Sequence, residues 1–201
     1  MPARKPWLRR LRVPSPGLGD IPVTQQANRV WFRVHQSKFP AKFFSRNGSH
    51  RFSDPKCRFA VLYLATDVAT CLFERFGDAM YDRRMAIANS LWIASSVSCL
   101  RVPRLKICDL TRPRTLSALK VDLAALMNHD LRTPQQWCFA IQNHAAGFQA
   151  IKFRSRFNAK ACLAVFARDG LESRIKEELI GPLHENQSAA DWLQEHQVSL
   201  Y

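Results

Sequence analysis

Residues 58–77 read RFAVLYLATDVATCLFERFG. The rest of the chain is organised around this stretch, which decides the fold. Residues 60–65 are apolar except for the hydroxyl of Tyr63, which is typical of a strand covered on both faces. Apolar residues at helical spacing follow directly. The stretch therefore predicts a buried strand that runs straight into a helix.

The predicted helix carries Glu74, the only glutamate before Glu172. Thr66 or Asp67 can cap it, because either side chain can accept a hydrogen bond from a free backbone N–H group. Gly77 is its expected end. A lone carboxylate in a region rich in arginine and lysine is a candidate functional group, although a helix-surface glutamate paired with Arg75, or with an Arg or Lys elsewhere, would give the same pattern.

Length and composition favour one domain. A chain of 201 residues with 47% apolar residues can bury one ordinary core. No run of about 18 apolar residues is present, so no membrane span is expected. Proline and glycine follow the basic N-terminus, where a signal peptide would have its apolar core, so we expect a cytoplasmic protein.

The six cysteines form no CxxC pair and lie mostly in apolar runs, which favours reduced, buried thiols. No residues show the paired short spacing of a zinc site, and we expect no metal. The chain also has no GxGxxG, GxxxxGK[ST], HExxH or GxSxG motif.

Charge is unevenly distributed along the chain, whose formal net charge is +14. Residues 168–201 hold three basic and seven acidic residues, which leaves 27 basic and nine acidic residues before them. Such an excess favours an anionic partner, which could be nucleic acid, an acidic protein or a phosphate-bearing small molecule. A merely solubilising surface would give the same composition.

We divide the chain into a basic arm (1–28), a core (29–167) and an acidic extension with a short helix (168–201). Residues 29–35 alternate as a strand does, and 39–50 form a loop long enough to cover a site. Further strands are predicted at 91–101, 104–110, 148–153 and 161–167, and helices at 81–89, 115–127 (broken near Val121) and 134–146. This alternation predicts an α/β or α+β domain.

Four motifs in a fixed order resemble the RES domain family, named for an arginine, a glutamate and a serine. They are Trp31-Phe32-Arg33-Val34, the Arg51-Phe52 turn, residues 61–65 followed by Glu74, and residues 151–156 followed by the strand through Phe166. The resemblance covers residues 29–167. Matched by motif, the three name-giving residues are Arg33, Glu74 and Ser155.

The resemblance implies a fold similar to ADP-ribosyltransferases, with a twisted, partly antiparallel sheet flanked by helices. It implies a toxin of a bacterial toxin–antitoxin pair, with an Xre-type antitoxin that binds DNA and plugs the toxin's site. It further implies NAD as the substrate, degraded by hydrolysis or phosphorolysis, or used to modify a protein with ADP-ribose. Nucleic acid would then be contacted only through the antitoxin, and a homo-oligomer is compatible with this reading.

Each candidate residue has an expected role in NAD cleavage. Glu74 would stabilise the positive charge that builds on the ribose. Arg33 and Arg51 would hold the pyrophosphate, and Ser155 would donate to a phosphate or ribose oxygen. Tyr63 would stack on a ring of NAD, while a core tyrosine with a satisfied hydroxyl is an equally good reading. For Ser155 the alternative is a plain turn serine.

Two classes of function therefore remain from the sequence. The first is an NAD-consuming enzyme, either a glycohydrolase or phosphorylase or an ADP-ribosyltransferase acting on a cellular protein. The second is a non-catalytic basic module that uses residues 1–12 for nucleic-acid binding or for another interaction.

Overall fold

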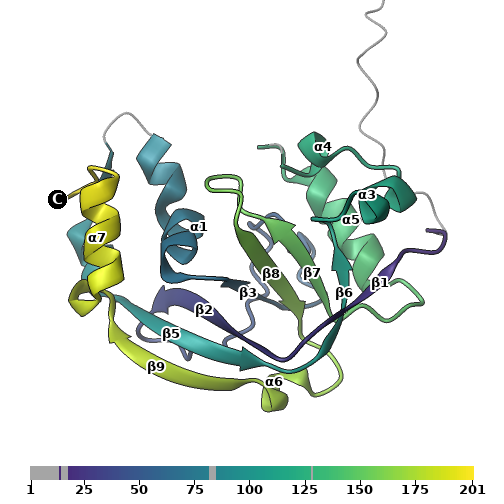
Figure 1. The fold of residues 1–201 in the computed structure, drawn as a ribbon, viewed down its shortest axis with the longest axis horizontal. Coiled ribbons are helices and arrows are strands. Elements are labelled where there is room, and N and C mark those ends of the chain that lie inside the picture. Colours follow the sequence, from purple (N-terminus) through teal and green to yellow (C-terminus); the bar gives the residue numbers. More distant parts are fainter. Residues whose placement is uncertain (1–13, 15–17, 82–84, 128) are drawn as a thin grey trace, which may run out of the picture.

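The computed structural model describes residue 14 and residues 18–81, 85–127 and 129–201. Most of these residues fold over one curled eight-stranded sheet (Figure 1). The strand order is β1 (Val23–Gln26), β6 (Leu105–Asp109), β7 (Ala150–Arg154), β8 (Ala161–Phe166), β3 (Val61–Ala65), β2 (Arg29–Gln36), β5 (Ser95–Val102) and β9 (Lys176–Pro182). Within this sheet, β6 and β7 are the only neighbours among the described residues that pair in parallel, so the α+β prediction with a partly antiparallel sheet is confirmed.

Helices stand in two groups on the same side of the curled sheet (Figure 1). One group comprises α1 (Val68–Tyr81) and α7 (Gln187–Glu195); the other comprises α3 (Pro113–Leu119), α4 (Leu123–Met127) and α5 (Arg132–Gln142). The short elements are α2 (Asn89–Ile93), α6 (Leu171–Arg174), a 3-10 turn (Leu183–Glu185) and a two-stranded sheet of β4 (Ala86–Ile87) and β10 (Ser199–Leu200). Among the described residues, no helix is long and apolar enough to cross a membrane.

The central strand β3 is buried on both faces, as its continuous apolar sequence predicts. Val61 and Ala65 join the core cluster between the sheet and the helices. Leu62 and Leu64 join a second cluster on the opposite face, together with Trp31 of β2. Because successive side chains of a strand point to opposite faces, both cores depend on this one strand.

The capping prediction for α1 is confirmed, and Asp67 is the capping residue. Its Oδ1 accepts hydrogen bonds from the backbone N–H and the Oγ1 of Thr70, both at 2.8 Å. The prediction that Gly77 ends the helix is wrong, since α1 continues to Tyr81. A Cβ atom at Gly77 would lie 2.5 Å from the ring of Phe157, so this glycine permits close packing against the β7–β8 turn.

Other boundaries also differ from expectation. The predicted helix over 81–89 is wrong beyond α1: residues 82–84 lie outside the described residues, and β4 and α2 follow. The break predicted near Val121 is found between α3 and α4, where Lys120 adopts a left-handed conformation.

Both flanking segments enter the sheet. Residues 1–13 and 15–17 of the expected arm lie outside the described residues, but β1 already pairs with β6 before residue 29. The acidic segment after residue 168 supplies β9 to the far edge of the sheet, and α7 packs against α1. The eight-stranded sheet therefore extends beyond residues 29–167 at both ends.

Asp67→Ala is expected to lower the free energy of unfolding by about 1 kcal/mol, because it removes the N-cap of α1. Asp67→Asn is the matched control, since an asparagine oxygen caps a helix about as well. Urea unfolding of both variants checks the prediction. Equal loss in the two variants would assign the effect to the ion pair of Asp67 with Lys160 (3.1 Å) and not to the cap.

Candidate active site

The candidate site lies where β2 and β3 separate. These two strands pair at a single position, Phe32 opposite Ala65. Beyond it the strands diverge, and Ser45 bridges Val61 at the other end of β3. Side chains from both strands line the opening, and α1 and the loop before β3 close it.

The opening forms a cavity of about 300 Å³. A second cavity of about 230 Å³ adjoins it and shares His50, Arg51, Glu74 and Phe153. The first cavity is lined by Arg33, Val34, Ser45, His50, Arg51, Val61, Tyr63, Leu64, Ala65, Cys71, Glu74, Arg75, Phe153 and Cys162. The structure thus brings four of the five predicted site residues, Arg33, Arg51, Tyr63 and Glu74, to one cavity.

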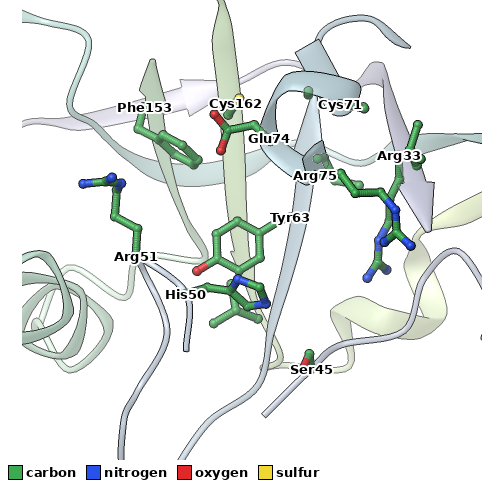
Figure 2. A pocket seen from close by; sticks show the side chains of 14 residues that line it. Arg33, Ser45, His50, Arg51, Tyr63, Cys71, Glu74, Arg75, Phe153 and Cys162 are labelled. Carbon is green, nitrogen blue, oxygen red and sulfur yellow. The ribbon is translucent and has the colours of Figure 1, made fainter. Parts of the chain in front are cut away.

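Glu74 lies at the junction of the two cavities, presented by α1 (Figure 2). Its side chain keeps access to solvent, but desolvation by the surrounding protein raises its pKa. Hydrogen bonding by Ser155 and the charges of Arg51 and Arg156 oppose this shift. Among the described residues, Glu74 forms no ion pair with its neighbour Arg75, and the cations whose charge it feels are Arg51 and Arg156.

The hydroxyl of Tyr63 is bound by the protein, whereas its ring lines the cavity. Its hydroxyl accepts the backbone N–H of Phe52 at 3.0 Å and hydrogen-bonds Ser53 Oγ at 3.2 Å. Its ring lines the cavity and lies against the ring of His50, with centroids 5.4 Å apart. The hydroxyl therefore holds the loop next to Arg51, while the ring face is available to a ligand.

Arg33 and Arg51 lie on opposite sides of Tyr63 (Figure 2). Arg33 Nη1 donates to the carbonyls of Ala41 and of Phe43 (2.9 Å to the latter), and burial together with the charge of Arg75 lowers its pKa to about 10. Arg51 Nη1 donates to the carbonyl of Leu126 at 2.7 Å. Burial and the charge of Arg156 lower the pKa of Arg51. The two arginines therefore belong to different ends of the site.

Ser155 is not among the residues that line either cavity. It is buried at the start of the turn between β7 and β8, where its Oγ accepts the backbone N–H of Phe157 at 3.3 Å. Its contact with the site is through Glu74, whose pKa it lowers by hydrogen bonding. This geometry fits a positioning residue for the carboxylate better than a direct ligand of a substrate.

Two residues of the cavity were missed as site residues in the sequence. Arg75 entered there only as a possible ion-pair partner of Glu74, and His50 only as the end of a loop. His50 has its pKa lowered by burial and by the charge of Arg33. Their one sequence signal is proximity to residues of the motifs, His50 directly before Arg51 and Arg75 directly after Glu74.

The cysteines of the described residues are free thiols, four of them buried, while Cys57 and Cys99 are not. Within the parts of the chain that the structure describes, no group of three or more His, Cys, Asp or Glu side chains is placed to hold a metal ion.

The protein therefore has a mixed α+β fold whose sheet opens into a cavity where β2 and β3 separate. Glu74 and three arginines line that cavity. The chain belongs to the RES domain family, whose family model matches residues 30–185. A solved structure similar in fold is the Mycobacterium tuberculosis MbcT–MbcA toxin–antitoxin complex, with a TM-score of 0.61 and 16% identity over 88% of this chain and 93% of the other. No curated protein matches the sequence significantly.

Asp54 fixes the loop that presents Arg51 and His50. This buried carboxylate accepts hydrogen bonds from the backbone N–H (2.8 Å), Nε (2.7 Å) and Nη2 (2.9 Å) of Arg58 and from the N–H of Lys56 (3.2 Å). Hydrogen bonding from Arg58 lowers its pKa from 3.8 to about 2, although burial alone would raise it. The carboxylate is therefore stabilised in its charged form only in the folded protein.

Asp54→Ala is expected to lower the free energy of unfolding at pH 7 by about 2 kcal/mol, the value of such a pKa shift. Because the folded pKa is the lower one, this stability is present above about pH 4 and is lost as the pH falls toward 2. Urea unfolding at pH 7 and between pH 4 and 2 measures both effects. Asp191→Ala, which removes an exposed carboxylate, is the control and should change little; an equally small effect of Asp54→Ala would contradict the prediction.

Proposed function

We propose that this chain is the toxin of a toxin–antitoxin pair and that it consumes NAD by cleaving the bond between nicotinamide and ribose. Membership of the RES domain family and the likeness to a chain of a toxin–antitoxin complex support the toxin role. The observation that carries the enzymatic role is Glu74, a partly desolvated carboxylate that lines both of the joined cavities and has arginines on both sides.

Cleavage of this bond builds positive charge on the ribose as nicotinamide leaves. A carboxylate fixed beside the ribose stabilises that charge, and it does so more strongly where protein has replaced part of the water. Glu74 fits both conditions, since α1 holds its backbone, Ser155 hydrogen-bonds its carboxylate and the cavity walls replace part of its water, while one side stays open to solvent. Nicotinamide departs as a neutral group, so no second carboxylate is needed as an acid.

The remaining residues supply binding surfaces for NAD. The rings of Tyr63 and Phe153 line the cavity beside Glu74 and can stack on a flat ring of the substrate. Arg33 and Arg51 offer guanidinium groups to the phosphates, from opposite ends. The acceptor of the ADP-ribosyl group would be water, phosphate or a protein side chain.

An antitoxin is the proposed protein partner. The solved complex of similar fold is a toxin with its antitoxin, and the family resemblance suggests an Xre-type protein here. The cavity walls hold more cationic than anionic side chains, so an acidic segment of the partner would be attracted to the same opening as the dianionic substrate. Inhibition by plugging the site follows from that shared charge preference.

Glu74→Gln is expected to slow NAD loss by a factor of at least about 100, because the substitution removes the charge that stabilises the transition state and keeps the side-chain shape. The measurement is NAD remaining after mixing with purified protein, with circular dichroism to show that the variant is folded. Glu172→Gln, an exposed glutamate on α6, is the matched control and should retain full activity.

Unchanged NAD in the presence of wild-type protein, measured both with and without added inorganic phosphate, would reject hydrolysis and phosphorolysis. Transfer to a protein is then tested with NAD labelled in the ADP-ribose part. Label on a protein, dependent on Glu74, would identify an ADP-ribosyltransferase, and no label would reject the NAD-consuming function altogether.

The pH profile offers an independent check on the state of Glu74. Because burial raises its pKa, the carboxylate gains a proton at a higher pH than the usual value of about 4.3. The rate of NAD loss should therefore fall on the acid side before the pH reaches that value. A rate that stays constant down to the usual glutamate range would show that Glu74 does not act as a charged group in the slow step.

A further inference from the structure

Arg33 of β2 and Arg75 of α1 bring two guanidinium groups to the same end of the cavity (Figure 2). The charge of Arg75 is the second-largest cause of the lowered pKa of Arg33, after burial. Burial also lowers the pKa of Arg75. Two partly desolvated cations thus face one another at a cost in free energy, which a bound anion would offset.

The partners that the structure gives these two arginines are neutral. Arg33 Nη1 donates to the two loop carbonyls already described, and Arg75 Nη2 donates to Ser95 Oγ at 3.1 Å. Arg75 Nε is buried and has no hydrogen-bond partner among the described residues. An unsatisfied buried donor costs about 1–3 kcal/mol, so this N–H group points to an acceptor that arrives with a ligand.

Further hydrogen bonds fix the positions of the two guanidinium groups. Ser95 Oγ donates to the carbonyl of Leu91 at 2.7 Å, which leaves its lone pairs for Arg75. The two loop carbonyls likewise fix the plane of the Arg33 guanidinium. Glu177 is the one acidic residue whose charge raises the pKa of Arg33, and its Oε2 already accepts the N–H of Lys42 at 2.7 Å.

The opposite end of the site differs in its charge balance. Arg156, beside Arg51, forms an ion pair with Asp78, and Glu74 and Asp78 both raise the pKa of Arg51. Carboxylates therefore already compensate the cations at that end. At the Arg33 and Arg75 end no ion pair is formed by the described residues.

We propose that Arg33 and Arg75 form an oxyanion subsite, separate from the Arg51 end, that takes a phosphate group. Guanidinium groups remain charged at any working pH and present several N–H donors in one plane, which suits phosphate oxygens. As a statement about the substrate site, the inference rests on the proposed function, but anion binding can be measured without turnover. The phosphate group belongs either to the pyrophosphate of the substrate or to free inorganic phosphate.

The test is binding of inorganic phosphate to the full-length protein by calorimetry at constant ionic strength. Arg75→Gln is expected to weaken the affinity at least tenfold, which is about 1.4 kcal/mol. Arg75→Lys keeps the charge but loses the planar fork and should weaken it less, and it serves if the glutamine variant does not fold. Arg101→Gln removes an exposed charge of β5 away from the cavity and is the matched control.

Unchanged phosphate affinity in both Arg75 variants would overturn the subsite. So would equal weakening by Arg101→Gln, which would indicate only a general effect of charge, or by Arg156→Gln, which would place the phosphate at the other end. Competition with ADP-ribose, which carries the pyrophosphate, distinguishes the two sources: displacement assigns the subsite to the substrate, and simultaneous binding assigns it to free phosphate.

Failure of this inference and failure of the proposed function give different results. Phosphate binding that depends on Arg75, with no NAD consumed or transferred, would keep the subsite and reject the enzyme. NAD loss that depends on Glu74, with phosphate binding indifferent to Arg75, would do the reverse.

Discussion

The single residue pair that joins β2 to β3 is the constraint on which the site depends. β2 is paired with β5 along its whole length, and β3 is paired with β8 along its whole length. These two halves of the sheet meet only at Phe32 and Ala65. The opening beyond that pair therefore lies between two hydrogen-bonded walls, which hold Arg33 and Tyr63 apart with little freedom to collapse onto one another.

Helix α1 places opposite charges on either side of that opening. Glu74 and Arg75 are consecutive, so a helix of 3.6 residues per turn directs their side chains about 100° apart. Glu74 is directed toward Ser155 and the second cavity, while Arg75 is directed toward Ser95 and Arg33. Two consecutive positions of one helix thus place the carboxylate proposed to stabilise positive charge and the guanidinium proposed to bind an anion on different sides of the opening.

Local sequence predicted the elements whose causes are local. The apolar run of residues 60–65 and the capping side chain at Asp67 are short-range signals, and both were confirmed. The end of α1 was not predictable in this way, because Gly77 is required by Phe157, 80 positions further along the chain. A glycine that allows close packing and a glycine that ends a helix look the same in sequence.

Sequence motifs predicted those residues of the candidate site that belong to a motif. Glu74, Arg33, Arg51 and Tyr63 were found through their order along the chain, and the structure gathers them at one cavity. The sequence assigned Arg33 and Arg51 to one pyrophosphate, but a motif contains no information on the distance between two residues in space. The structure places these two arginines at different ends of the site (Figure 2). The same limit holds for Arg75, because its charge acts on Arg33 of β2, which comes close to α1 only in the folded protein.

The acidic segment shows how a composition signal acquires a structural meaning. As β9 it pairs with β5, and Glu177 accepts the N–H of Lys42. Arg33 donates to the carbonyls of the two residues that flank Lys42 by one position, Ala41 and Phe43. An anion and a cation thus hold one loop through opposite backbone groups, and the charge of Glu177 reaches Arg33 across it. The acidic extension therefore helps to hold the loop that positions Arg33 at the basic end of the cavity.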